Sequence, residues 1–147
     1  MIAYREFETA TSCRFDALDI TANVRDMVQS SGIVEGTVLV FAPHTTCCVS
    51  LASSDEDLTK EIAHLMAVVA PEDLYYAHDD LDVRTENLVE HEPPNARSHI
   101  TYLFAGKPSE SVVVSDGRLV LGEDQRILLI ELDSPRPRRY CVQVLGE

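Results

Sequence analysis

The chain lacks several features that would assign it to a large class of proteins. Its 147 residues include no apolar run near the ~20 residues that a membrane-spanning helix needs. They also include no phosphate-binding P-loop, no Rossmann glycine fingerprint, no GxSxG nucleophile elbow and no HExxH zinc motif. We see no signal peptide at the start of the sequence, so we expect a cytoplasmic protein with no membrane partner.

Positive charge is scarce. The chain has 12 Lys and Arg against 25 Asp and Glu, and its formal net charge of -13 argues against a nucleic-acid partner, because phosphate backbones would repel it. Residues 55–92 alone hold 12 carboxylates and two basic side chains, a net of 2 - 12 = -10. Five basic residues gather toward the C-terminus, where they would bind phosphate or carboxylate or form surface ion pairs between subunits: Arg118, Arg126, Arg136, Arg138 and Arg139.

The four cysteines form no CxxC pair. Cys47 and Cys48 are adjacent, so they would point to opposite faces of a strand. Their apolar neighbours favour inert, reduced thiols over a catalytic nucleophile.

Apolar spacing predicts three helices. The first is capped by Asp19 or Thr21 and ends at Gly32. The second starts at a capping box over Ser53–Glu56, and the third is capped by Asn95. The faces expected to pack inward are Ile20, Val24, Met27 and Val28 in the first helix, Leu58, Ile62, Leu65, Met66 and Val69 in the second, and Ala96, Ile100, Leu103 and Phe104 in the third.

The remaining apolar segments predict strands, and residues 70–94 form a long acidic loop without periodicity, of the kind that is functional or mobile. Because most strands follow the helices, we expect a single α+β domain over 1–147 with mostly antiparallel sheets. The expected strands are one or two within 2–18, then 38–41, 47–51, 112–114, 119–121, 127–132 and 140–144, with a hairpin turn at Asp116-Gly117.

Three histidines stand where chemistry is expected. His44 follows a buried strand, His78 lies among acids in the long loop, and His99 shares the apolar side of the third helix. Three imidazoles that converge form a metal site with open positions for water or substrate. The plainer alternative is that each ring is satisfied by a structural hydrogen bond. His64 and His91 are expected on the surface, without a role.

Polar residues near these histidines are candidates for substrate contact. The hydroxyls of Thr45, Thr46 and Ser98 would orient substrate or a bound water. Arg118 follows the hairpin turn and would bind an anionic group, although a pendant surface charge is the alternative reading. Gln125 is expected to face the same region.

The order of these motifs resembles that of the YjbQ family, whose members are often labelled secondary thiamine-phosphate synthase enzymes or proteins of unknown function. The resemblance covers nearly the whole chain. It rests on Ser31-Gly32-Ile33, Gly36, Phe41-Ala42-Pro43-His44-Thr45-Thr46, Tyr76-Ala77-His78-Asp79, Ser98-His99-Ile100, Asp116-Gly117-Arg118-Leu119-Val120-Leu121-Gly122, Gln125 and Val144-Leu145-Gly146-Glu147.

This resemblance implies a compact α+β homotrimer with a site near subunit contacts. It also implies a divalent metal ion, with zinc as the candidate, held by His44, His78 and His99. The implied activity joins a pyrimidine diphosphate to a thiazole phosphate.

The chain departs from the family pattern in two places. Ala52-Ser53 stands where the family usually has Asn-Glu, and Glu123-Asp124 stands where it usually has Thr-Trp. The first change removes a carboxylate, and the second removes an aromatic ring that would stack on a substrate.

Two hypotheses follow. The first is a small metal-binding enzyme that acts on an anionic or phosphorylated metabolite, with thiamine-phosphate synthase-type chemistry on phosphorylated heterocycles. The second is a non-catalytic, trimeric metabolite- or ion-binding protein, which the lost carboxylate and aromatic favour.

Overall fold

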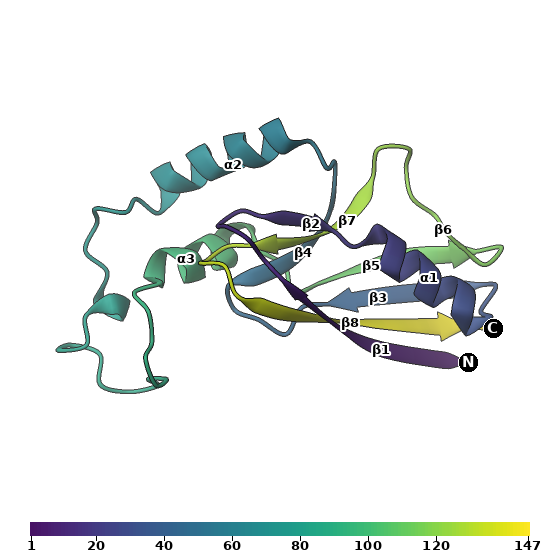
Figure 1. The fold of residues 1–147 in the computed structure, drawn as a ribbon, viewed down its shortest axis with the longest axis horizontal. Helices are drawn as coiled ribbons and strands as arrows, with labels where there is room; N and C mark the ends of the chain where they lie inside the picture. Colours follow the sequence, from purple (N-terminus) through teal and green to yellow (C-terminus); the bar gives the residue numbers. More distant parts are fainter.

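A computed structural model describes residues 1–147 and has an α+β architecture with two antiparallel sheets (Figure 1). The five-stranded sheet has the order β1-β8-β3-β5-β6, and the three-stranded sheet has the order β2-β7-β4. The strands are β1 (Ile2–Ala10), β2 (Ala17–Asp19), β3 (Gly36–Phe41), β4 (Cys47–Ala52), β5 (Ser109–Ser115), β6 (Arg118–Leu119), β7 (Arg126–Glu131) and β8 (Pro137–Gly146).

Alternating apolar residues explain the main sheet. Strand β8 lies between β1 and β3, and it buries Tyr140, Val142 and Val144 on one face. This period of two is the signature of a strand with one face in a core. Helix α1 (Thr21–Ser31) adds Val24 and Val28 to the same core. The predicted α+β class and antiparallel sheets are confirmed.

The N-terminal helix agrees with its predicted end. Gly32 adopts the left-handed conformation at φ 70°, and Ile33 is buried directly after it. The start differs in detail, because Ile20 is the N-terminal flanking residue and no side chain caps it. Asp19 instead accepts a hydrogen bond from the Thr21 amide at 2.9 Å.

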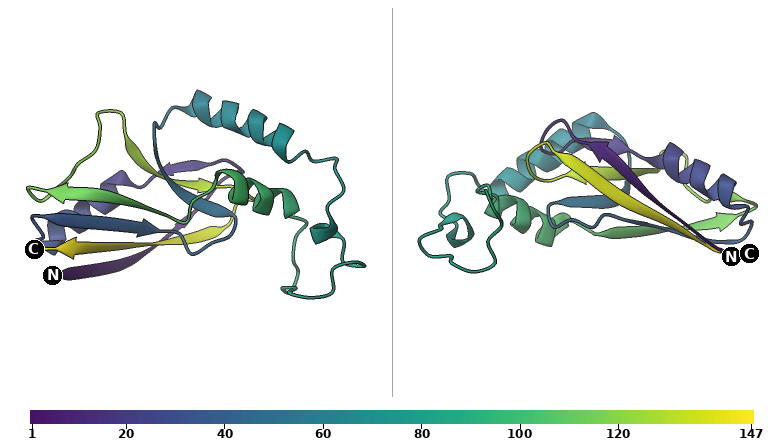
Figure 2. Two further views of the ribbon diagram at one scale, coloured as in Figure 1. Left: turned by 180° about the vertical axis from the view of Figure 1, so that it is seen from behind. Right: turned by 60° about the horizontal axis from the view of Figure 1, so that its bottom comes forward.

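The second helix, α2 (Glu56–Val69), corrects two predictions. Its N-cap is Asp55, whose carboxylate accepts from the Asp57 amide at 2.8 Å, so the capping box over Ser53–Glu56 was wrong. Met66 is its only buried residue. Figure 2 shows the helix standing away from the sheets. The face predicted to pack inward is largely exposed at Leu58, Ile62 and Leu65.

The third helix, α3 (Ala96–Ala105), also presents apolar residues to solvent. Leu103 is 84% exposed and Phe104 is 67% exposed, whereas Ala96, Ser98 and Thr101 are buried. The inward face predicted for this helix was therefore wrong for its last turn. Within one chain, the buried hydroxyls of Ser98 and Thr101 connect α3 to the rest of the fold, through hydrogen bonds with Asp133 and Arg14.

The long segment before α3 is ordered around one arginine. It contains a short 3-10 helix, η1 (Ala77–Asp79), and loops out beyond α3 (Figure 2). The Arg84 guanidinium donates to the backbone oxygens of His78 and Asn87 and to both carboxylate oxygens of Glu92, the last two at 2.9 Å. None of the helices is long and apolar enough to cross a bilayer.

Candidate functional site

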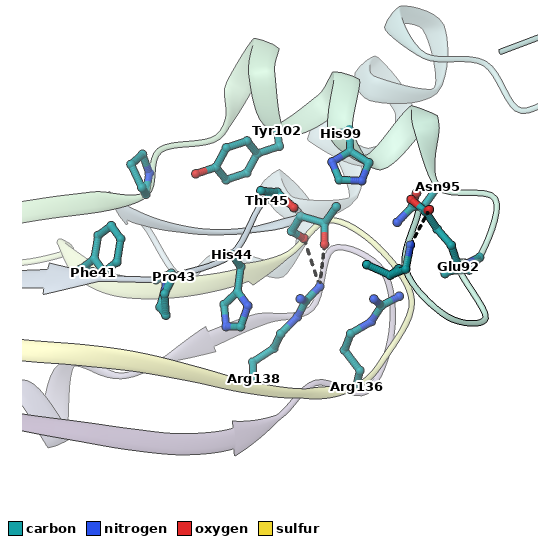
Figure 3. A pocket seen from close by; sticks show the side chains of 15 residues that line it. Phe41, Pro43, His44, Thr45, Glu92, Asn95, His99, Tyr102, Arg136 and Arg138 are labelled. Carbon is teal, nitrogen blue, oxygen red and sulfur yellow. Dashed lines mark hydrogen bonds between the residues drawn. The ribbon is translucent and has the colours of Figure 1, made fainter. Parts of the chain in front are cut away.

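A cavity of about 550 Å³ lies where the β3–β4 connection faces α3 and the start of β8 (Figure 3). Polar and basic side chains dominate its lining. The polar and charged residues of the lining include His44, Thr45, Thr46, Glu92, Asn95, His99, Arg136 and Arg138.

His44 reaches the cavity because β3 stops before it. The chain turns at Pro43, and the His44 amide donates to the Ala42 oxygen at 2.8 Å. The ladder between β3 and β8 ends at Phe41 and Cys141, which leaves the Arg139 peptide without a strand partner on that side. The Nε2 atom of His44 fills this place, 3.0 Å from the Arg139 oxygen and 3.2 Å from its nitrogen.

Behind His44 lies a buried ion pair. Arg138 donates from Nε to Oε2 of Glu131 at 2.7 Å and from Nη2 to Oε1 at 2.5 Å, and the two side chains are 5% and 0% exposed. Such a bidentate pair satisfies both charges where water cannot. Arg138 also donates to the hydroxyl of Thr46 at 3.0 Å, which ties the turn after His44 to β8.

Glu131 extends the network toward α3. It accepts from the Thr11 hydroxyl at 2.8 Å and from the Asp133 amide at 2.9 Å. The Asp133 carboxylate in turn accepts from the Ser98 hydroxyl at 2.9 Å and contacts Arg136. A continuous set of charge-assisted bonds therefore joins both sheets to α3.

Two of the predicted histidines meet on the far side of the cavity. The rings of His78 and His99 lie with centroids 4.9 Å apart, edge to face. Glu92 approaches His78 Nε2 at 3.6 Å, and Arg84 lies 3.2 Å from the same nitrogen. The hydrogen bonds from Arg84 hold the pKa of Glu92 below its usual value, so this carboxylate is ionised at neutral pH.

Burial sets the protonation of two cavity histidines. Desolvation lowers the pKa of His44, and the charge of Arg138 lowers it further. Desolvation followed by the neighbouring His78 lowers the pKa of His99. Both rings are thus neutral at pH 7, the form in which an imidazole accepts a proton or donates a hydrogen bond.

The predicted three-histidine metal centre is not preformed. No group of three or more His, Cys, Asp or Glu side chains is arranged to hold an ion. His44 directs Nε2 at the Arg139 backbone and lies apart from His99 in Figure 3. The Arg84 guanidinium beside His78 Nε2 further opposes a cation there. The three rings as placed do not fit a shared ion.

The other predicted site residues divide into two groups. Thr45 and Thr46 line the cavity, and Ser98 lies behind it on Asp133. Arg118 is exposed on β6, at the far end of the main sheet from α3 (Figure 1), and Gln125 lines a separate depression near α1. Within one chain these last two do not join the histidines.

Sequence reasoning missed the buried ion pair behind the cavity and the place of two arginines in its lining. Glu131 ends an apolar strand and gives no sign of being the anchor of a buried pair. The sequence marks Arg136 and Arg138 only as members of a basic cluster that would bind phosphate or carboxylate or form surface ion pairs between subunits. The alternation Pro135-Arg136-Pro137-Arg138, which runs into the start of β8, is the available signal, since every second residue of an extended segment lies on the same face.

The two buried thiols stay protonated at neutral pH. Burial raises the pKa of Cys47 to about 12 and that of Cys48 to about 11. Neither forms the thiolate that a nucleophile requires at neutral pH.

Comparison with known proteins finds relatives that match nearly the whole chain. The profile of the family described as UPF0047 protein YjbQ-like matches residues 5–147. A UPF0047 protein from Archaeoglobus fulgidus is 35% identical over 140 residues, 95% of this chain and 99% of its own. One from Methanothermobacter thermautotrophicus is 33% identical over 97% of this chain and 92% of its own.

Solved structures of similar proteins have the same fold. A YbjQ-like protein of unknown function from Sulfolobus solfataricus superposes with a TM-score of 0.85 at 28% identity, covering 100% of this chain and 99% of its own. A hypothetical protein from Aeropyrum pernix gives 0.82 at 30% identity, with 99% of each chain covered.

The depressed histidine pKa values make a prediction. In a 15N-resolved titration we expect His44 and His99 to protonate with midpoints below 6.5, with His44→Gln and His99→Gln used for assignment. The two histidines bind protons at about pH 6.5 in the unfolded chain but only at lower pH in the native state. Their full contribution to the free energy of unfolding is therefore present above pH ~6.5. It is lost as the pH falls from there toward the native midpoints. Midpoints at or above 6.5 would contradict the burial argument.

Proposed function

This chain belongs to the UPF0047 family of YjbQ-like proteins, and from its cavity we propose that it binds a small anionic or phosphorylated metabolite and transforms it. The observation that carries the proposal is the pairing of neutral imidazoles with guanidinium groups around one cavity. Arg136 supports an anion subsite because its Nη1 makes no hydrogen bond within the chain, while Asp133 and Ser134 hold its Nη2.

The proposed chemistry is proton transfer at a held substrate. Arg136 binds the anionic group, and the Thr45 hydroxyl helps orient it. His44 and His99 line the cavity as neutral rings that move protons to or from the substrate. The specific form that the family resemblance supplies is condensation of a pyrimidine diphosphate with a thiazole phosphate. The thiazole nitrogen bonds to the methylene carbon of the pyrimidine as the bond from that carbon to the diphosphate breaks, and the diphosphate leaves as pyrophosphate, to which an imidazole can donate a proton.

Anion binding is tested by isothermal titration with inorganic phosphate. We expect Arg136→Met to weaken phosphate binding at least about tenfold, because a charged hydrogen bond is lost. Arg25→Met on exposed α1 removes the same charge away from the cavity and is expected to leave binding unchanged. An equal loss of phosphate affinity in both variants would mean that binding depends only on the net charge of the protein and not on Arg136.

Turnover separates the enzyme from the second hypothesis, a non-catalytic binder. Product detection by mass spectrometry with the pyrimidine diphosphate and thiazole phosphate pair supports the enzyme, provided that His44→Gln abolishes the product. Tight binding of either phosphate without product supports the binder.

A divalent metal ion is a second candidate ligand, favoured by the 4.9 Å approach of the His78 and His99 rings. Zinc would require Arg84 to move away from His78. In equilibrium dialysis of protein purified without tag or chelator, we expect bound zinc to be lost in both His78→Ala and His99→Ala. Its retention by both variants would refute a histidine site, with exposed His64→Ala as the control.

We also propose that the chain assembles as a homotrimer. The family resemblance supplies the number of copies. The apolar surface that α2 and α3 leave uncovered, which is unusual for a monomer, supports self-association. We expect the native protein to have three times the mass of one chain in light scattering, and Leu65→Glu/Phe104→Glu to release monomers. A native monomer would contradict this proposal; Val113→Glu, on an exposed position of β5, is the matched control.

A further inference from the structure

Asn95 holds the position that an N-cap residue usually fills, but its side chain does not cap α3. Asp79, from the 3-10 helix 16 residues earlier, performs this task instead. Its Oδ1 accepts from the backbone amides of Asn95 and Ala96, both at 2.9 Å. The Asn95 side chain is therefore not needed to cap the helix, which is the role for which asparagine is favoured at this position.

The Asn95 amide is buried and makes no side-chain hydrogen bond within the chain. Asn95 is 7% exposed, and its Oδ1 has no hydrogen-bond partner. A buried acceptor without a donor costs free energy, so native proteins rarely keep one without a reason. Because the terminal torsion of asparagine is broad, the amide can turn its oxygen toward a donor that arrives in the cavity that Asn95 lines.

The opposite wall of the cavity carries hydrogen-bond donors with positive charge. Figure 3 shows Arg138 on β8 and Arg136 just before this strand, with His99 and Asn95 on the α3 side of the cavity. One wall thus offers cationic donors, and the other offers an acceptor that lacks a donor. Glu92, ionised and next to Asn95 in the same lining, adds negative charge on the second side.

We propose that Asn95 is a specificity residue that recognises a hydrogen-bond donor, a hydroxyl or an amine, on a small metabolite whose anionic group lies against Arg136. This inference rests on the proposed anion site and narrows its substrate class. The ligand carries an anion at one end and an O–H or N–H group at the other, a few bonds apart. An alkyl phosphate of the same size would leave Oδ1 unpaired and bind more weakly.

The test compares three probes of equal length by isothermal titration: 2-aminoethyl phosphate, 2-hydroxyethyl phosphate and propyl phosphate, with a second set one carbon longer. In the native protein we expect the amino or the hydroxyl probe to bind at least about tenfold more tightly than the alkyl probe. In Asn95→Leu this preference should disappear, while the affinity for propyl phosphate is kept. That retained affinity also reports that the variant is folded.

Asn95→Asp gives a second reading, since it keeps an acceptor of the same shape and adds charge. We expect it to retain the preference for donors and to favour the amine over the hydroxyl more strongly than the native protein does. Equal binding of all three probes by the native protein, or an unchanged preference in Asn95→Leu, would overturn the role of Asn95 and leave the anion site standing. Failure of every probe to bind would overturn the anion site itself, and this inference with it.

Discussion

The buried pair of Arg138 and Glu131 is the interaction on which the arrangement of the cavity depends. It joins β8 of the five-stranded sheet to β7 of the three-stranded sheet, and its remaining hydrogen bonds reach Thr46 and Thr11. Taking two charges out of water is costly, and only a full set of partners offsets that cost. The pair therefore fixes the orientation of the two sheets relative to each other. Through the bond from Arg138 to Thr46 it also fixes the position of the turn that carries His44.

Most of the fold could be predicted because alternation and turn residues act locally. Val38, Val40, Val142 and Val144 are buried as the period of two requires, and Gly32 ends its helix in the left-handed conformation. The errors concern the apolar faces of α2 and α3, which were predicted to pack inward and are largely exposed within one chain. An apolar pattern predicts that a helix face packs against other apolar atoms, but it does not indicate whether those atoms belong to the same chain.

The site was predictable in part, for a related reason. His44, Thr45, Thr46 and His99 come together because strand ends and a helix face bring them to one cavity. Glu131 could not be found, since a charge at the end of an apolar strand reads as solvent-facing until its partner is known. Asp79 replaced Asn95 as the cap of α3 through a contact that no local rule describes. Long-range polar bonds, not propensities, decided these positions.

The most direct measurement of this account is the stability of Glu131→Gln, compared by urea unfolding with Asp57→Asn in the exposed Asp57–Lys60 pair. Removing one member of a buried pair leaves the other charge uncompensated, so we expect a loss of roughly 3–5 kcal/mol and a displaced His44 resonance. The exposed pair should contribute about 0–1 kcal/mol. A loss in Glu131→Gln no larger than in Asp57→Asn, with the His44 signal unmoved, would show that the pair does not organise the cavity.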